Sequence, residues 1–315
     1  MGQPWRVSRC YVRSMTLSPG NTGAPSVVGL CLHQPRSRVP LEPFWMQFLR
    51  GAEDVLADRG RTLLLKVVAD PDEEVATLRR WHETGQVVGV IVADLASGGD
   101  ERLELLREIG MPAVVMAQPL LAPGFATMST DNASSMREAV EFLASAGHRI
   151  IGRVTGPKEF MHTLVRDDAF DAAGVRLGIE TVSVTSDYTS IGGAEATAEL
   201  LARSDRPTAL IFDNDLMALA GLEVVHAAGL TVPDDVAILA WDDSVHCQLA
   251  SPPLSALMHD LLAYGAETAM VLLDVLDGVP NPSRVAEQPR LVVRASTLPV
   301  PEPRLPNTPD VHLQG

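Results

Sequence analysis

The sequence predicts an α/β protein with two doubly wound parallel-sheet lobes and a ligand cleft between them. Three observations carry this prediction: short β-rich runs alternate with helix-length amphipathic segments, the chain has 315 residues, and 46% of them are hydrophobic. Alternation of this kind indicates repeated βαβ units, in which helices cover both faces of a parallel sheet. The length corresponds to two units of roughly 100–200 residues. Because the alternation is too long for one small sheet, we expect two.

Strands are expected where short β-branched and aliphatic runs lie between turn residues. These runs are Val27–Leu32, Thr62–Val68, Val87–Val92, Ala113–Met116, Ile150–Thr155, Val182–Val184, Ala209–Phe212 and Val236–Ala240. In doubly wound sheets, ligands bind beyond the carboxyl ends of the strands. The loops that follow these runs are therefore the expected positions of binding residues.

Helices are expected between the strands, where apolar residues recur at i, i+3 and i+4. The clearest segments are Trp45–Arg59, Glu73–Glu83, Arg102–Ile109, Ser134–Ala146 and Leu216–Ala228. Two of them are preceded by residues suited to N-capping, since their side-chain oxygens accept from free N–H groups of the first turn. These capping residues are Asp131 or Asn132 in one helix and Asp213 or Asn214 in the other.

Charge and cysteine count limit the class of function. The formal net charge is −15 and the pI is near 4.9, so the chain lacks the basic surface that supplies most non-specific nucleic-acid affinity. No apolar run reaches the roughly 18 residues of a membrane span. Cys10, Cys31 and Cys247 are widely spaced and odd in number, which predicts neither a disulfide framework nor a zinc site. Together with the lack of a secretory signal, this favours the cytoplasm.

The two ends of the chain differ from the rest. Residues 1–25 have no hydrophobic periodicity and are expected to form a flexible lead-in. Residues 300–315 belong to a proline-rich stretch that is expected to be a disordered tail.

The motifs of common enzymes are missing from the sequence. There is no phosphate-binding P-loop, no G-x-G-x-x-G after a strand, no H-E-x-x-H and no G-x-S-x-G nucleophile elbow. The eight histidines are scattered rather than spaced as metal ligands. We therefore expect a protein that is not an enzyme and that needs no cofactor and no metal. A pair of carboxylates distant in the sequence is still compatible with these observations.

Polar residues follow three of the predicted strands. Arg166 lies downstream of the strand that ends near Thr155, Asn214 follows Phe212, and Trp241 and Asp242 follow Ala240. A guanidinium offers five donors, an amide both donates and accepts, and a carboxylate only accepts. This combination suits vicinal hydroxyl groups, and an indole ring can lie against the apolar face of a sugar.

Structural roles explain each of these residues equally well when it is considered alone. Arg166 is as well suited to pair with a neighbouring aspartate on an exposed helix, and Asn214 to cap a helix. Asp242 can belong to a turn, and Trp241 to the core. What favours the binding interpretation is the shared position of all four at strand ends.

An ordered series of short motifs runs from about Ser26 to Thr297. It includes Gly110-Met-Pro112-Ala-Val-Val115, Thr130-Asp-Asn132, Ala146-Gly-His-Arg149, Pro207-Thr-Ala-Leu-Ile-Phe-Asp-Asn-Asp-Leu-Met-Ala218, Gly229-Leu-Thr-Val-Pro-Asp-Asp-Val236 and Leu291-Val-Val-Arg-Ala-Ser-Thr297. Each motif alone is weak, but the ordered series is highly specific. By this series the chain resembles the effector-sensing domain of the lactose-repressor/galactose-repressor (LacI/GalR) family of transcription regulators, which has the type I periplasmic-binding-protein-like fold.

The resemblance implies two lobes joined by three crossovers, with a sugar or similar polar effector in the cleft, and a homodimer. It places the first lobe at about 26–149 plus 260–284 and the second at about 150–259 plus 285–299. It also implies ligand-binding positions, with Arg166 as the arginine that holds effector hydroxyls and Phe44, on the loop after the first strand, as part of the wall. The remaining implied positions are Asn214, Asp242, Trp241, Asp131 and His259.

The largest departure from the family pattern is at the beginning of the chain. Family members begin with a helix-turn-helix and a hinge helix, whereas only 25 residues precede the first predicted strand here. Those residues carry three arginines and no acidic residue, which leaves −18 for the remainder. The chain as written is therefore expected to lack the DNA-binding head. It would act on DNA only if a helix-turn-helix is encoded upstream of Met1 or supplied by a partner.

Two other classes of function remain open at this point. One is a stand-alone or import-associated solute-binding protein that does not bind DNA. The other is a glycosidase that uses Asp131 and Asp242 as its two carboxylates.

Overall fold

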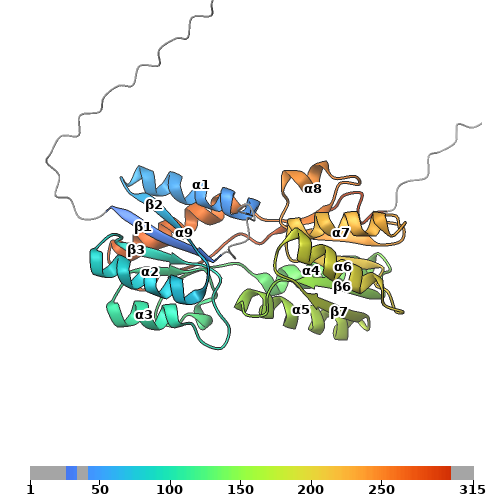
Figure 1. Ribbon diagram of the computed structural model, residues 1–315, viewed down its shortest axis with the longest axis horizontal. Helices are drawn as coiled ribbons and strands as arrows, with labels where there is room; N and C mark the ends of the chain where they lie inside the picture. Colours follow the sequence, from blue (N-terminus) through green and yellow to red (C-terminus); the bar gives the residue numbers. More distant parts are fainter. Residues whose placement is uncertain (1–25, 34–41, 299–315) are drawn as a thin grey trace, which may run out of the picture.

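The computed structural model describes residues 26–33 and 42–298, which form two α/β lobes side by side (Figure 1). Each lobe is built on a six-stranded sheet, and the two strand orders correspond, with β11-β5-β4-β3-β1-β2 in the first lobe and β12-β10-β9-β8-β6-β7 in the second. The strand pairs are parallel except for β10 and β12, which are antiparallel. The predicted fold class of two doubly wound parallel-sheet lobes is confirmed.

The first lobe contains the first five strands, four helices and one strand from near the end of the chain. Its strands are β1 (Val27–His33), β2 (Thr62–Val68), β3 (Gly89–Val92), β4 (Ala113–Val115), β5 (Ala126–Ser129) and β11 (Ser283–Val285). Its helices are α1 (Pro43–Asp58), α2 (Pro71–Thr84), α3 (Glu101–Ile109) and α9 (Leu261–Leu276), together with the short 3₁₀ helix η1 (Pro119–Leu121).

The second lobe repeats this plan. Its strands are β6 (Ile150–Thr155), β7 (Glu180–Thr185), β8 (Ala209–Phe212), β9 (Ala237–Trp241), β10 (Ser255–Met258) and β12 (Arg290–Val292). Its helices are α4 (Asn132–Ser145), α5 (Met161–Leu177), α6 (Ser190–Leu201), α7 (Asp215–Ala227) and α8 (Val245–Leu249).

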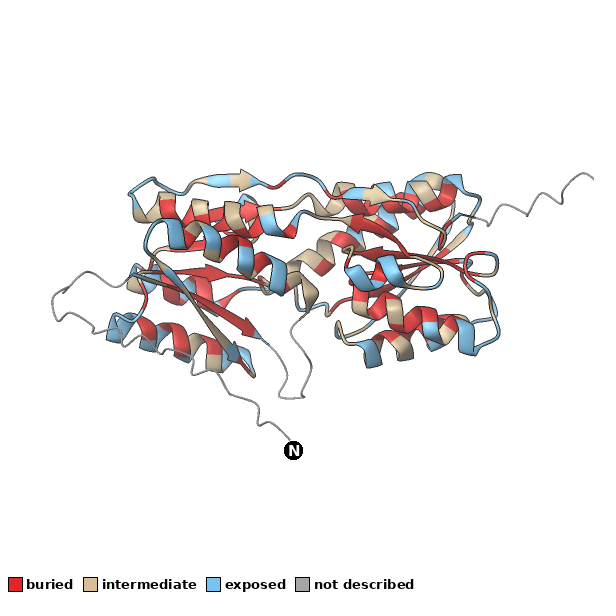
Figure 2. Cartoon of the chain, turned by 90° about the horizontal axis from the view of Figure 1, so that it is seen from above, coloured by how far each residue is buried: buried red, intermediate tan, exposed pale blue. Residues whose placement is uncertain are grey.

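Each sheet has a hydrophobic core on both of its faces, and buried residues fill the centre of each lobe in Figure 2. In the first lobe, the α1 and α9 face buries Phe48 and Leu272, and the other face buries Trp81 and Leu106. Burying a side chain of this size contributes about 1.5–3 kcal/mol. Because strands buried on both faces have few polar positions, the polar side chains of each sheet are concentrated at the strand ends.

Two glycines let α1 and α9 approach unusually closely. A Cβ added at Gly51 would lie 1.9 Å from the carbonyl oxygen of Leu262, and one at Gly265 would lie 2.0 Å from that of Phe48. Backbone atoms cannot move away cheaply, so only glycine fits at either position. This close packing fixes the amino-terminal end of α1, and with it Glu42 and Phe44, at the cleft.

The first crossover between the lobes lies earlier than predicted. The boundary was expected at residue 149, but α4 packs against α5, and its residues Met136 and Leu143 share a core with Ile151 and Phe170 of the second lobe. The chain therefore crosses between Ser129 and α4. The apolar stripe of a helix does not reveal which of two sheets it covers, and this explains the error.

The other two crossovers lie close to their predicted positions. The chain returns to the first lobe between β10 and α9, and it leaves again between β11 and β12. The predicted change at residue 285 falls on the last residue of β11, which pairs with β5 of the first lobe. Four short strands, β5, β10, β11 and β12, were not predicted.

Several sequence-based expectations concern segments outside the described residues. The lead-in at 1–25, which includes Cys10, and the tail at 300–315 both lie there. Within the described residues, Cys31 and Cys247 are buried free thiols. No helix in that part of the chain has the length and apolar character needed to cross a membrane.

Candidate functional site

A cavity of about 150 Å³ lies between the lobes, at the carboxyl ends of the central strands of both sheets. Residues of both lobes line it. The structure brings six of the seven predicted binding residues together around this cavity, and these are Phe44, Arg166, Asn214, Trp241, Asp242 and His259. The seventh, Asp131, is not among the lining residues. Clustering of polar groups at the ends of parallel strands is the arrangement expected of a ligand site in this class of fold.

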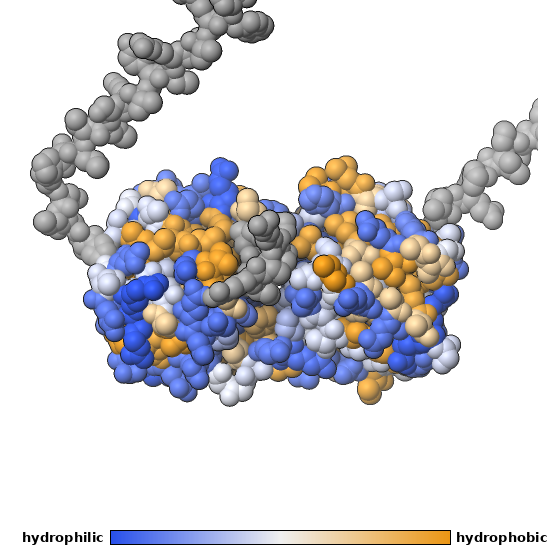
Figure 3. Space-filling view, in the orientation of Figure 1, coloured by the Kyte–Doolittle hydropathy of each residue, from blue (hydrophilic) through white to orange (hydrophobic). Residues whose placement is uncertain are grey.

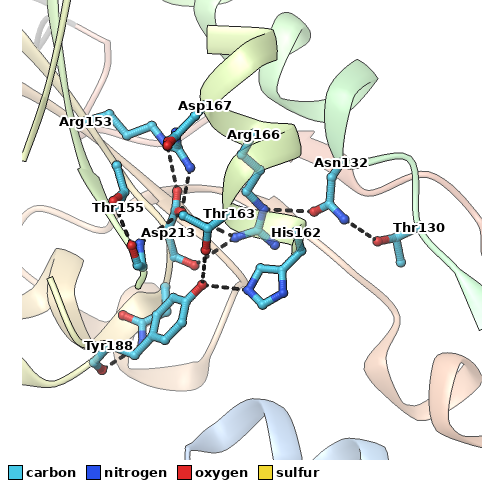
Figure 4. Close-up of polar contacts among 12 residues, drawn as sticks. Thr130, Asn132, Arg153, Thr155, His162, Thr163, Arg166, Asp167, Tyr188 and Asp213 are labelled. Atoms are coloured by element: carbon cyan, nitrogen blue, oxygen red, sulfur yellow. Dashed lines mark hydrogen bonds and ion pairs between the residues drawn. The ribbon is translucent and has the colours of Figure 1, made fainter. Parts of the chain in front are cut away.

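Arg166 is held at the cavity by three contacts from the second lobe (Figure 4). Its Nε donates to Oδ1 of Asn132 at 2.8 Å, and its Nη1 donates to the carbonyl oxygen of Asp213 at 3.3 Å. The guanidinium carbon also lies 3.7 Å from the ring centroid of Trp241, a cation–π contact. Nη2 has no hydrogen bond within the described part of the chain, so it can donate to a ligand. Arg166 therefore faces the cavity from α5 and forms its ion pair with Asp213, at 3.8 Å from Nη1, rather than with a neighbouring aspartate of its own helix.

A second arginine, Arg153, organises the charges behind Arg166. Its fully buried side chain donates from Nε and Nη2 to the two carboxylate oxygens of Asp213, at 2.8 and 2.7 Å, and from Nη1 to Asp167. Burial alone would raise the pKa of Asp213, but the charges of Arg153 and Arg166 outweigh it and hold that pKa below its usual range. Asp213 therefore remains ionised and fixes both arginines.

Asn214 combines its two predicted roles. Its Oδ1 caps α7 by accepting from the backbone N–H of Met217 at 2.9 Å, which is the structural role inferred from sequence. Its amide Nδ2 donates to the carbonyl oxygen of Tyr188 at 2.9 Å and to Oε2 of Glu42 at 3.3 Å. The contact with Glu42 crosses the cleft from the second lobe to the first. The cap uses the amide oxygen, and the two hydrogens of the NH2 group are donated to Tyr188 and Glu42, so Asn214 holds the cavity wall together.

Asp242 presents an unsatisfied carboxylate to the cleft. Its Oδ1 is buried and has no hydrogen-bond partner among the described residues. Burial, reinforced by the negative charge of Asp215, raises the pKa of Asp242 to about 7. The next residue, Asp243, has a different role, since it forms a bidentate ion pair with Arg294 at 2.8 and 2.7 Å. The Asp-Asp pair thus supplies one structural and one cavity-facing carboxylate.

Backbone strain is concentrated at the same cavity. Four non-glycine residues in the described part of the chain have positive φ, and three of them line the cavity: Asp94 at 48°, Tyr188 at 65° and Asp242 at 70°. The fourth, Asn281, does not. Such conformations cost of order 1–3 kcal/mol each and tend to occur where a binding site requires them.

Aromatic rings form the wall that the first lobe contributes. Phe44 lies in the first turn of α1, not on the loop where it was predicted, and its ring centroid is 4.9 Å from that of Trp45. His259, from the crossover after β10, lies 5.0 Å from Tyr264 by the same measure. Its Nε2 is buried without a partner among the described residues, and burial lowers the pKa of His259 to about 4. His259 is therefore neutral at pH 7.

Asp131 is the N-cap of α4, as one of its two predicted roles required, and it is not among the residues that line the cavity. Its carboxylate caps α4 by accepting from the backbone N–H of Ser134 at 2.9 Å. The next residue, Asn132, lines the cavity and accepts from Arg166. The carboxylate pair on which a glycosidase mechanism would rest, Asp131 and Asp242, is thus not brought together across the cavity.

Sequence patterns did not predict several other cavity residues, among them Glu42, Asp94, His162 and Tyr188. The Nε2 atom of His162 and the hydroxyl of Tyr188 lie 2.7 Å apart, and burial lowers the pKa of His162 to about 3 (Figure 4). Asp94 follows β3 by two residues, so the strand-end rule that found Asn214 could have found it too. Glu42 and His162 stand next to helix starts and carry no comparable signal in the sequence.

Sequence comparison identifies the relatives of this chain. Residues 140–297 match the periplasmic binding protein-like domain family. The chain is 30% identical over 281 residues to the HTH-type transcriptional regulator CelR of Thermobifida fusca, an alignment that covers 87% of this chain and 82% of CelR. It is also 30% identical over 267 residues to the HTH-type transcriptional repressor CytR of Escherichia coli, covering 82% of this chain and 77% of CytR. These relatives are transcriptional regulators rather than enzymes.

Structural comparison agrees with the sequence relationship. A LacI family transcriptional regulator from Bifidobacterium animalis subsp. lactis superposes with a TM-score of 0.79 at 35% identity, covering 88% of this chain and 99% of that one. The complex of the regulator CelR with cellobiose superposes with a TM-score of 0.78 at 29% identity, covering 86% and 84%. The chain therefore belongs to the LacI family of transcriptional regulators and contains the effector-binding domain of that family.

Proposed function

We propose that the effector of this regulator is an uncharged sugar, which binds in the cavity between the lobes. The observation that carries the proposal is the orientation of Arg166, whose Nη2 remains available while Asn132, Asp213 and Trp241 hold the rest of the guanidinium. A fixed donor beside an acceptor carboxylate, Asp242, matches the hydroxyl groups of a sugar, each of which both donates and accepts. The related regulator CelR forms a complex with cellobiose, which supports the same ligand class for this chain.

The charge of the cavity supports an uncharged ligand over an anionic one. Glu42, Asp94 and Asp242 all line it, and Arg166 is the lining arginine. Burial raises the pKa of Glu42 to about 8 and also raises that of Asp94. These raised pKa values favour the protonated forms near neutral pH, and the ionised Asp213 already balances the charge of Arg166. A phosphate or carboxylate would therefore find no uncompensated positive charge, whereas a hydroxyl group can donate to a carboxyl oxygen or accept from a protonated carboxyl group.

In the proposed mechanism the sugar changes the balance between open and closed lobes. The Asn214–Glu42 hydrogen bond and the backbone hydrogen bonds Ser97 N to Glu159 O and Met161 N to Leu95 O join the two lobes, and in this mechanism they belong to the closed form. A sugar that contacts Arg166 on one side and Phe44 on the other favours this arrangement through its differential affinity for it. The closed form would act, in a homodimer in the cytoplasm, on a helix-turn-helix encoded next to this domain or carried by a partner.

The proposal is tested by thermal-shift screening against sugars, nucleosides, amino acids and sugar phosphates, followed by calorimetry. A bound ligand raises the melting temperature by mass action, with about 2.7 kcal/mol of stabilisation at a hundredfold excess over Kd. We expect uncharged sugars to produce the largest shift and sugar phosphates to produce none. Stabilisation by sugar phosphates or nucleosides instead of uncharged sugars would contradict the proposed effector class.

A further inference from the structure

A second cavity, of about 290 Å³, adjoins the first at the edge of the cleft between α1 and α8. Phe44, Asp242 and His259 line both cavities. In the space-filling view, apolar and polar side chains are mixed on the visible face of both lobes (Figure 3). The remaining lining residues of the second cavity are Pro43, Gln47, Asp215, Asp243, Ser244, Gln248, Met258, Asp260 and Leu261.

Unsatisfied polar atoms are concentrated around this second cavity. Four buried side-chain atoms in the described part of the chain have no hydrogen-bond partner, and three of them belong to its lining: Oδ2 of Asp215, Oδ1 of Asp242 and Nε2 of His259. The fourth is the hydroxyl oxygen of Ser186. Buried polar atoms in native proteins nearly always have partners, so a group of three at one cavity indicates a missing partner molecule.

Asp215 is the clearest member of the group. It is only 3% exposed, and its position in the first turn of α7 holds the carboxylate in place. Burial raises the pKa of Asp215, against the effect of a hydrogen bond from Ser244 to the carboxylate. The atom left without a partner is an acceptor or, when protonated, a donor.

The chemistry of the lining identifies the kind of group that would fit. Among the described residues, no lysine or arginine lines the second cavity, so this part of its lining offers an anionic group no positive charge. The described acidic and histidine residues do not form a cluster with the geometry of a metal site. Hydroxyl groups can donate to Asp215 and Asp242 and can either donate to or accept from His259. Phe44, Met258 and Leu261 supply the apolar surface that a sugar ring requires.

The combined volume of the two cavities agrees with a ligand that extends through both of them. Sites for small molecules typically enclose about 300–1,000 Å³. The cavity at Arg166 is too small to reach this range alone, whereas the two cavities combined fall within it. We infer that the effector is a sugar of two rings, with one ring beside Arg166 and the second ring donating hydroxyl hydrogen bonds to Asp215 and Asp242. This inference rests on the proposed function, because it assumes that a sugar occupies the first cavity.

The test compares monosaccharides with disaccharides by calorimetry on the wild-type chain. The probes are glucose and galactose against cellobiose, maltose and lactose. We expect at least one disaccharide to bind at least tenfold more tightly than either monosaccharide. Equal or tighter binding of a monosaccharide would overturn the inference but leave the proposed function intact. A wild-type chain that binds none of these sugars would contradict the proposed function, and this inference would fall with it.

Two variants locate the second ring. Gln47→Trp places a large side chain in the second cavity from an exposed position on α1, and Asp215→Leu removes the buried acceptor. Each should reduce the preference for the disaccharide to less than threefold. Gln86→Trp, a matched substitution at an exposed position away from both cavities, should leave the preference unchanged. If Gln47→Trp kept the wild-type preference for the disaccharide over the monosaccharide, the inference would be overturned, even if Asp215→Leu failed to fold.

Discussion

The two lobes share one strand order, yet each uses its buried arginine in a different way. In the first lobe, Arg102 pairs with Asp100 and Glu74 and donates to the backbone carbonyl oxygens of Ala93 and Asp94, each at 2.9 Å. In the second lobe, Arg153 pairs with the side chains of Asp213 and Asp167. The arginine of the first lobe thus holds a backbone segment, and that of the second lobe holds a carboxylate.

The difference determines what each lobe presents to the cleft. Arg102 fixes the strained backbone of Asp94 and leaves the Asp94 carboxylate facing the cavity. Arg153 binds both carboxylate oxygens of Asp213, which in turn pairs with Nη1 of Arg166 at 3.8 Å, so that Nη2 of Arg166 remains available to a ligand. The first lobe therefore supplies acceptors and an aromatic wall, and the second supplies an oriented donor. A sugar placed between them would complete a set of hydrogen bonds that neither lobe can complete alone.

The largest expected effect concerns the buried network of the second lobe. Arg153→Met should lower the free energy of unfolding by about 3–5 kcal/mol, because it leaves the Asp213 carboxylate buried without its partner. The double substitution Arg153→Met with Asp213→Leu should recover much of this loss, since it removes both charges. Urea denaturation measures both variants.

The same measurement on Arg102→Met tests the comparison between the lobes. The side chain of Arg102 is 10% exposed, against 0% for Arg153. Its partners can recover some hydration, so this substitution should cost less than Arg153→Met. An equal or larger loss would show that the two networks do not differ in the way described.

Arg166→Ala should have the next largest effect, and on binding rather than on stability. It removes a charge-assisted hydrogen bond of about 1.5–3 kcal/mol, which corresponds to a loss of sugar affinity of roughly 10–150-fold. Calorimetry with the sugar that stabilises the wild type most measures this loss. Arg166→Lys keeps the charge but not the geometry of the guanidinium, and it should bind with intermediate or low affinity. Unchanged affinity in Arg166→Ala would refute the proposed role.

A pH dependence of stability is expected from two buried carboxyl groups. Burial raises the pKa of Asp242 to about 7 and that of Glu42 to about 8, above the ordinary values near 4 of the unfolded chain. The folded protein therefore holds more protons than the unfolded protein between about pH 4 and pH 8, and these two groups lower stability as pH rises through this window. In the double variant Asp242→Asn with Glu42→Gln, urea denaturation between pH 5 and pH 8.5 should show a smaller decrease than in the wild type. An identical decrease would contradict this assignment.

The smallest effect concerns the hydrogen bond that joins the lobes. Glu42→Ala removes the contact between Glu42 and Asn214, worth about 0.5–1.5 kcal/mol, and should shift the lobes towards the open arrangement by no more than about tenfold. Small-angle scattering without ligand measures this shift as a larger radius of gyration. Glu42→Gln keeps an acceptor oxygen in the same place, so it should behave like the wild type. Opening in both variants to the same extent would show that another property of Glu42 is responsible.

Sequence periodicity predicted eight of the twelve strands in the described residues, and it missed the buried strands β5 and β10 as well as the edge strands β11 and β12. The interior strands β1, β6 and β8 are continuous apolar runs with turn residues at their ends, and their predicted bounds agree closely with the structure. The edge strands β11 and β12 have three residues each and are largely exposed. These two strands form because the returning chain reaches a free edge of each sheet. That pairing depends on the tertiary structure, and no local sequence pattern predicts it.

The cavity residues likewise include some that sequence patterns predict and some that they do not. Asn214 and Asp242 were found because polar residues directly after an apolar strand are conspicuous, whereas Arg166 lies on α5, beyond the end of β6, and Trp241 is the last residue of β9. Asp131 and Asn132 could not be distinguished in the same way, since they are adjacent and both are good capping residues. The position at which α4 begins gives the two residues different roles. The side chain of Asp131 caps the helix, and the side chain of Asn132 contacts Arg166.

By itself, the sequence determined the fold class and most of the polar set at the strand ends, because strand–helix alternation and the positions that follow strands are local properties of a chain. Only the tertiary structure decided that α4 covers the second sheet, that Asp213 is bound by Arg153, and that Glu42 reaches Asn214. These contacts join residues 60 and 172 positions apart in the chain, so no local pattern can encode them. They also decide which polar groups are already satisfied and which remain available to a ligand.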